Sequence, residues 1–337
     1  MTRILSTNPE TTGPLPVAIG LTAAIVAVPA DEPLILTVRT GGTGALAALP
    51  SGPFDPVRHR TFEIGLRAWV AEQTGMSLGY VEQLYTFGDR GRHARAGDRD
   101  PHVVSVGYLA LTRLAEDQPG DVRDFRGRDF RSWYEFFPWE DWRTGRPELI
   151  ETTILSGLAE WVEAAPAALS SSGLRRRDRV SLLFHPNSRG FNEENALERY
   201  ELLYEAGLVE EAWRDGREAA LKRGRPAPLG TPMQHDHRRI LATAMGRLRA
   251  KMKYRPVIFE LMPPSFTLTE LQRTVEAITG RHLHKQNFRR LVETSAAVEP
   301  TGEVSLKTGG RPAALFHFRR NVLQEGPAPG LRVGIRG

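Results

Sequence analysis

The chain has 337 residues, of which 40% are hydrophobic and 25% are charged, and it contains no cysteine. This composition is that of an ordinary globular protein and excludes disordered and membrane-embedded classes. The lack of cysteine excludes disulfides, a cysteine nucleophile and a zinc–thiolate site, and leads us to expect a protein of the reducing cytoplasm. No uncharged apolar run reaches about 18 residues, so we expect no membrane-spanning segment.

The formal net charge of +5 is unevenly distributed. Residues 233–323 carry 16 Lys and Arg against 7 Asp and Glu, whereas residues 1–232 are net negative. A positive charge concentrated at one end indicates a polyanionic partner for that part only.

The first half of the chain predicts a mixed α/β domain after a flexible tail over residues 1–14. Hydrophobic patterning predicts strands at Val17–Val28, Leu34–Arg39, Tyr80–Phe87 and Val103–Thr112. Apolar residues at helical spacing predict a helix over Thr61–Gln73, with Gly75 as its stop. An aromatic stretch, WYEFFPWEDW, follows near residue 133, and we assign it to packing.

The middle of the chain predicts helices with one short strand. The expected elements are a helix over Pro147–Ala165, a strand over Val180–His185 and a helix over Asn192–Ala212. GRPAPLGTP, Gly224–Pro232, has the composition of a linker, and we place a domain boundary after it.

A helix is predicted over His237–Met252, as the first helix of a C-terminal domain, with Asp236 as its N-cap. Its inward face holds Ile240, Leu241, Ala244, Leu248 and Met252, and its other faces carry Arg238, Arg247, Arg249, Lys251 and Lys253. His235 and His237 are two positions apart, which does not put them on one helix face, so we expect no metal site there.

Residues 265–318 predict two short helices and a β-hairpin. Thr267 and Glu270 form a capping box at the start of the first helix, and Gly280 ends it. The second helix covers about 284–295, and two runs of alternating residues flank Gly309-Gly310. Helix, short turn, helix and basic hairpin together resemble a winged helix-turn-helix, although a small α+β domain with merely solvated basic residues is the alternative.

In a winged helix-turn-helix the second helix reads the major groove of DNA. We expect base contacts from Gln286, Asn287, Arg289 and Arg290, and phosphate contacts from Lys285, Lys307 and Arg311.

Residues 52–76 resemble the Nudix box, but with departures. Glu72 is kept, whereas Ala68-Trp69 stands in place of Arg-Glu and Gln73 in place of the last Glu. LYTFGDRGR, VVSVGYLAL and the C-terminal GRHLHKQNFRR and GRPAALFHF strengthen the match. Together they resemble the Nudix-related transcriptional regulators of NAD metabolism. The resemblance covers about residues 17–142 and 235–320 but not 143–230, which we interpret as an insertion of open function.

This resemblance implies an α/β (α+β) fold: a Nudix-like mixed sheet with flanking helices and a helical insertion, then a winged helix-turn-helix. The implied domains are 15–232 for effector sensing, including the insertion 143–230, and 233–323 for DNA binding, before a flexible tail at 324–337. In that family a Nudix-like domain without hydrolase activity senses ADP-ribose or a relative. We therefore expect a homodimeric repressor on a palindromic operator.

A Nudix hydrolase needs several carboxylates on one helix face to hold Mg²⁺. Glu63 and Glu72 are nine positions apart, which places them on opposite sides of a helix, so we expect no catalytic metal and no other cofactor. The residues that we expect to contact a nucleotide diphosphate are Arg39, Arg58, Asp89, Arg90 and Arg92. The alternatives are a solvated charged loop at these positions, a sensor of another metabolite such as a sugar, and an active Nudix hydrolase of a nucleotide diphosphate with a basic accessory domain.

Overall fold

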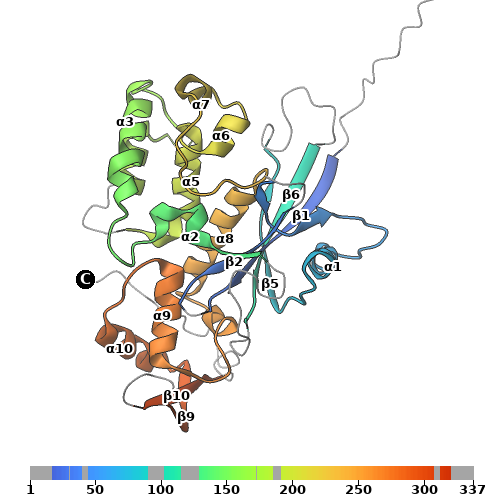
Figure 1. Ribbon diagram of the computed structural model, residues 1–337, viewed down its shortest axis with the longest axis vertical. Coiled ribbons are helices and arrows are strands. Elements are labelled where there is room, and N and C mark those ends of the chain that lie inside the picture. The colour runs from blue at the N-terminus through green and yellow to red at the C-terminus, as the bar shows by residue number, and fades with distance from the viewer. Residues whose placement is uncertain are drawn as a thin grey trace, which may run out of the picture.

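The computed structural model describes residues 17–29, 31–39, 45–89, 102–114, 129–171, 173–184, 191–306 and 312–319. A mixed sheet lies on the right in Figure 1, a group of helices packs beside it at the upper left, and a small helix-and-hairpin unit lies at the lower left. In the described part of the chain, no helix has the length and apolar character needed to cross a bilayer.

The central sheet is built on two long strands, β1 (Val17–Ala27) and β6 (His102–Leu111), which run parallel to each other. The strand order is β3-β2-β1-β6-β5, with the remaining pairs antiparallel. The other strands are β2 (Leu34–Arg39), β3 (Ala47–Ala48), β4 (Ser51–Pro53), β5 (Tyr80–Phe87) and β7 (Asp129–Ser132). Most of β1 is buried, as its nearly continuous apolar sequence requires of a strand covered on both faces.

One helix covers each face of this sheet (Figure 1). On one side α1 (Phe62–Thr74) packs Leu66 and Val70 against Leu21 and Ile25 of β1. On the other side α8 (His237–Lys251) shares a core with Ala24 and Val26 of the same strand. Alternate residues of β1 therefore enter two separate hydrophobic cores, one on each face of the sheet. We call residues 17–142 the sheet domain.

Apart from an isolated bridge between Leu169 and Arg175, the regular elements described within the insertion, residues 143–230, are helices. It contains a π-helix (Ile150–Ile154), α3 (Leu155–Glu163), α4 (Arg176–Phe184), α5 (Ala196–Glu205), α6 (Glu210–Arg214) and α7 (Glu218–Arg223). The predicted strand at Val180–His185 is wrong, because residues 180–184 form the end of α4, where Val180 and Phe184 reach the core at a helical spacing. The predicted long helix at Asn192–Ala212 is interrupted at Gly207, whose φ of 72° ends α5 before α6 begins.

The C-terminal unit consists of α9 (Leu268–Thr279), α10 (Lys285–Ser295) and a sheet of β8 (Phe266–Thr267), β9 (Val298–Ser305) and β10 (Ala313–Phe318) in the order β8-β10-β9. The predicted capping box is present, since Thr267 accepts from the Glu270 amide and Glu270 accepts from that of Thr267 at 2.6 Å. Gly280 ends α9 in the left-handed conformation at φ 71°, as predicted.

The helix α8 packs mainly on α5 and on the 3-10 helix before it, Glu193–Asn195, and also on β1, β5 and β6, with further contact to α9. Arg238 and Arg249, which the sequence places on the outer faces of this helix, are fully buried. The prediction of their exposure is wrong because each guanidinium donates to a buried carboxylate, that of Glu211 for Arg238 and that of Glu140 for Arg249. The domain boundary after residue 232 stays a prediction.

Candidate nucleic-acid interface and the groups that position it

One face of α10 is buried and the other is exposed. Phe288 and Val292 enter the core of the C-terminal unit, four positions apart as helix geometry requires. All five residues that we expect on the DNA side of this helix are exposed: Lys285, Gln286, Asn287, Arg289 and Arg290. The helix therefore presents two arginines, a lysine and two amides to solvent while its apolar side holds it in place.

Side chains of α9 fix the turn that leads into α10. Gln272 donates from Nε2 to the Leu283 carbonyl at 2.8 Å, and Glu276 accepts from the Leu283 amide at 2.8 Å. Both backbone groups of Leu283 are thus bound by the preceding helix. The direction in which α10 leaves the turn is consequently set by α9.

The hairpin of β9 and β10 projects beyond the helices (Figure 1). Lys307 and Arg311, the phosphate contacts predicted at its tip, lie outside the described residues. Leu306, immediately before them, is 78% exposed. The two basic residues stay predictions.

The helix α1 holds β4 through two side chains, Trp69 and Gln73. Trp69 donates from Nε1 to the Pro53 carbonyl at 2.8 Å, and its ring lies so close to Gly52 that a Cβ there would approach to 2.2 Å. Gln73 bonds both backbone groups of Ser51, at 3.1 and 2.7 Å. Glu63 is paired with Arg67 at 2.8 Å.

Three of the five predicted nucleotide contacts, Arg39, Arg58 and Asp89, lie within the described residues, and they stand on different elements. Arg39, at the end of β2, faces Asp129 at 3.6 Å. Asp89, just after β5, pairs with Arg239 of α8. Arg58 is exposed in the loop before α1. Arg90 and Arg92 lie outside the described residues. Strand pairing directs β2 and β5 towards the end of the sheet where β1 and β6 begin, although β4, and not β2, pairs with Gly20–Thr22 of β1.

Of the two histidines near residue 236, His237 is buried and binds the backbone, whereas His235 is exposed. His237 accepts from the Leu49 amide through Nδ1 at 2.9 Å, joining α8 to the loop between β3 and β4. Desolvation of its ring and the charge of Arg214 lower the pKa of His235. Within the described residues, no group of three or more His, Cys, Asp or Glu side chains is arranged to hold a metal ion.

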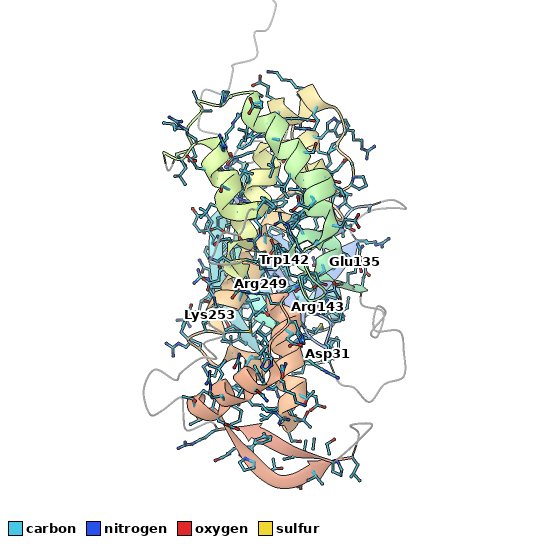
Figure 2. All side chains as sticks on the ribbon, turned by 90° about the vertical axis from the view of Figure 1, so that its left-hand side faces the viewer. Asp31, Glu135, Trp142, Arg143, Arg249 and Lys253 are labelled. Carbon is cyan, nitrogen blue, oxygen red and sulfur yellow. The ribbon has the colours of Figure 1, made fainter. Side chains whose placement is uncertain are left out.

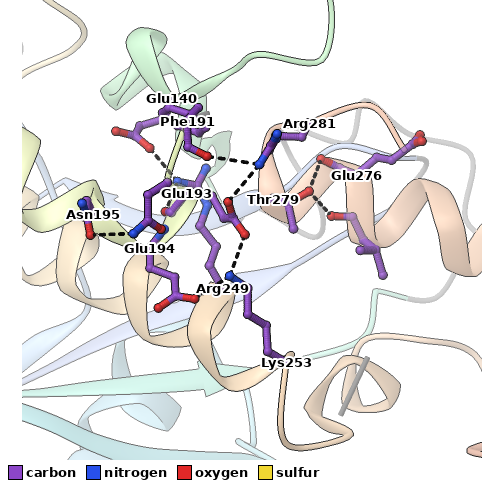
Figure 3. Close-up of polar contacts among 12 residues, drawn as sticks. Glu140, Phe191, Glu193, Glu194, Asn195, Arg249, Lys253, Glu276, Thr279 and Arg281 are labelled. Carbon is purple, nitrogen blue, oxygen red and sulfur yellow. Dashed lines mark hydrogen bonds and ion pairs between the residues drawn. The ribbon is translucent and has the colours of Figure 1, made fainter. Parts of the chain in front are cut away.

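A buried charge cluster, which sequence reasoning missed, lies where the sheet domain, the insertion and α8 meet (Figure 3). Its member on α8, Arg249, lies near the middle of the molecule in Figure 2. Glu140 accepts from Arg199 of α5 at 2.5 and 2.8 Å and from Arg249 of α8 at 2.6 Å. These three side chains are at most 2% exposed. Burial alone raises the pKa of Glu140, but Arg199 and Arg249 outweigh it, and the pKa lies below its ordinary value.

This cluster also holds the end of α9. Arg249 donates from Nε to the Ile278 carbonyl at 2.8 Å, and the Tyr134 hydroxyl donates to the Ala277 carbonyl at 2.7 Å. The Trp142 amide donates to the Gly280 carbonyl at 2.7 Å. Carbonyls at a helix C-terminus lack partners within the helix, and here the aromatic segment and α8 supply them. The winged unit is therefore bound to the rest of the molecule through the helix that precedes its turn.

Residues 258–318 match the family model of the NrtR DNA-binding winged helix domain, which confirms the predicted winged helix-turn-helix. Over 90 residues the chain is 45% identical to the ADPR responsive transcriptional repressor NtrR of Acinetobacter baylyi. That segment is 27% of this chain and covers only 36% of the relative's length.

The fold as a whole is similar to that of Shewanella oneidensis NrtR. Its crystal structures with a 27mer DNA and alone match with TM-scores of 0.51 and 0.50, at 18% and 19% identity. Each match covers 90% of this chain, and 94% and 95% of those chains. The predicted fold, a Nudix-like mixed sheet with helices followed by a winged helix, is confirmed.

Proposed function

We propose that the chain is a DNA-binding transcriptional regulator, a repressor of genes of NAD metabolism that acts as a homodimer in the cytoplasm. Its sheet domain binds ADP-ribose or a related nucleotide, and the bound nucleotide releases the winged helix from its operator. The observation that carries this proposal is the exposed polar face of α10, within a segment that matches a DNA-binding winged helix domain.

The chemistry of this face suits a major groove. Arginine forks onto the O6 and N7 acceptors of guanine, and glutamine and asparagine pair with adenine. Arg289, Arg290, Gln286 and Asn287 supply these groups, and Lys285 at the start of the helix supplies a phosphate contact. Phe288 and Val292 on the opposite face make this orientation the stable one, because reversing it exposes both.

Two observations support the proposed effector: the name of a relative and the direction of two strands of the sheet. The Acinetobacter protein is named as responsive to ADPR. Arg39 is the last residue of β2 and Asp89 follows the end of β5 by two positions, and both strands run towards the same end of the sheet in this chain. We place the nucleotide there, with arginines on its diphosphate and Asp89 on a ribose hydroxyl. Arg58, Arg90 and Arg92 complete the proposed set.

The proposal includes the absence of hydrolysis. In α1, Trp69 and Gln73 are bound to β4, and Glu63 is bound to Arg67. Glu63 and Glu72 are exposed at opposite ends of the helix, so they do not supply the convergent carboxylates that a phosphoryl-transfer metal requires.

Selection of bound sites from random DNA, followed by fluorescence anisotropy, tests this function. We expect a palindromic site to be enriched and ADP-ribose to weaken its binding, whereas ribose 5-phosphate serves as a control ligand. Because coupling between two ligands is reciprocal, the selected DNA must weaken ADP-ribose binding by the same factor. Failure to enrich any site would overturn the proposal, and a selected site that ignores every nucleotide would overturn its sensing half.

A further inference from the structure

We infer that the helical insertion is a clamp on the turn of the helix-turn-helix, with Glu193 and Arg281 as the positioning residues that let the sheet domain control the direction of α10. This inference rests on the proposed function, since it assigns a role in nucleotide control of DNA binding. It gives the insertion a task within the chain, in place of a separate binding activity.

The insertion contacts the turn between α9 and α10 directly (Figure 3). Arg281, the residue after Gly280, donates from Nη1 to the Phe191 carbonyl at 3.1 Å. The ring of Phe191 stacks on that of Trp142, with centroids 4.5 Å apart and planes 21° apart. Trp142 in turn holds the Gly280 carbonyl through its amide. Phe191, in the segment that leads into α5, and Trp142, at the end of the aromatic stretch, therefore enclose the two residues of the turn that follow α9.

A charged bridge crosses the same junction. Glu193 is 3% exposed and lies 3.4 Å from Arg281 and 2.9 Å from Lys253, which follows α8. Its carbonyl accepts from Arg249 at 2.9 Å. Burial works to raise the pKa of Glu193, but Lys253 and Arg281 reverse the effect, so the pKa lies below its ordinary value and the side chain is an anion. A single insertion residue thus binds the turn of the winged unit and the chain leading into it.

The insertion is anchored more firmly to the sheet domain and α8 than to the turn. Arg199 and Glu140 are at most 2% exposed, and a second pair, Glu211 with Arg238, is equally buried at 3.1 Å. By contrast, Arg281 is 34% exposed and Lys253 is 26% exposed. Breaking a buried pair leaves an uncompensated charge. When the half-exposed Arg281 leaves, water solvates its guanidinium, and Lys253 still compensates the buried Glu193.

This difference in burial determines which contact of the insertion breaks first in a conformational change. The insertion stays with the sheet domain, and the turn is the part that separates from it. A closed clamp fixes the direction of α10 relative to the sheet domain. In a homodimer it thereby also fixes the distance between the two copies of α10. An open clamp leaves α10 free of that control, since coupling requires a contact that differs between the two states.

Fluorescence anisotropy on Arg281→Ala tests the clamp. The quantity of interest is the coupling ratio, the Kd for the selected DNA with saturating ADP-ribose divided by the Kd without it. We expect Arg281→Ala to move this ratio at least halfway to one on a logarithmic scale, and Arg281→Lys to retain more of it because it keeps a cation near Glu193. Lys222→Ala, which removes an exposed pair with Glu218 elsewhere on the insertion, is the matched control and leaves the ratio unchanged.

Hydrogen exchange gives a reading that does not depend on DNA or nucleotide. In Arg281→Ala without ligand, we expect faster amide exchange in residues 280–290 and unchanged exchange in β1 and β6. A wild-type coupling ratio or unchanged exchange in this variant would overturn the clamp. Failure of the wild-type chain to bind any DNA would instead overturn the proposed function, and the exchange experiment would still decide the clamp.

Discussion

Arg249 donates from Nη1 to Oε2 of Glu140 at 2.6 Å, and neither side chain is exposed to solvent. The same guanidinium reaches the Ile278 carbonyl at the end of α9. A helix that packs on the sheet is thereby linked through one side chain to the helix-turn-helix. The consequences of this link for stability, for the turn and for DNA binding are open to measurement.

Glu140→Gln should lower the free energy of unfolding by about 3–5 kcal/mol at pH 7, because it leaves two buried arginines without their carboxylate. Since the folded-state pKa of Glu140 lies below the ordinary 4.5, its stabilisation is complete above that pH and is lost as the pH falls towards the folded value. The difference between variant and wild type should therefore shrink in acid. Urea unfolding at pH 7 and at lower pH measures it.

Glu218→Gln is the control for that experiment, since Glu218 is 81% exposed and its ion pair with Lys222 lies at the surface of the insertion. We expect little change in unfolding at either pH. Equal losses in the two variants would show that the buried position of Glu140 has no special effect.

Gly280→Ala should be more destabilising than Gly216→Ala, although both glycines have φ 71°. The backbone strain of alanine in the left-handed region, about 1–2 kcal/mol, is common to both. At Gly216 a Cβ meets nothing within 4 Å, whereas at Gly280 it lies 2.3 Å from the Glu140 carbonyl oxygen. We expect an additional loss of about 1–3 kcal/mol at Gly280 by thermal or urea unfolding. Equal losses would contradict the close contact.

Incubation with ADP-ribose and Mg²⁺ should give no turnover at the rates typical of enzymes. The reason is the use of Trp69 and Gln73 to hold β4, where a hydrolase needs metal ligands. Chromatographic detection of AMP and ribose 5-phosphate provides the measurement. Sustained product formation that depends on Mg²⁺ would favour the hydrolase alternative.

Local sequence patterns were sufficient to predict the winged unit. Thr267, Glu270 and Gly280 act on backbone groups within a few positions of themselves, so their roles can be recognised without tertiary structure. Phe288 and Val292 likewise reveal the buried side of α10 by spacing alone. The exposure of the predicted DNA contacts on that helix follows from the same pattern.

The buried charges could not be predicted in this way. Arg249 looks like an exposed residue because the carboxylate that compensates it, Glu140, is 109 positions away in an aromatic stretch that carries no local signal. The strand predicted at Val180 is wrong for a related reason, since a short apolar run fits a strand or a buried helix equally well. In both cases, residues distant in the sequence determine whether the side chain is buried and which element it belongs to.

Arg290→Ala should weaken binding to the selected DNA by about 1–3 kcal/mol if its guanidinium forks onto guanine, and it should relax specificity at that base pair. Arg290 is exposed on α10, so its removal should leave folding unchanged. Arg175→Ala, an exposed arginine of the insertion, is the control for net charge. Unchanged operator affinity in an anisotropy titration would refute the role of Arg290.

Lys307→Ala should weaken binding to all DNA sequences to a similar extent, because a phosphate contact carries no base information. Each phosphate neutralised by a cation releases counterions, so the slope of log K against log salt should become shallower by about 1. Titrations of selected and scrambled DNA over a range of salt concentrations measure both effects. An unaltered slope would place Lys307 away from the phosphates, and a loss confined to the selected site would indicate that Lys307 reads a base.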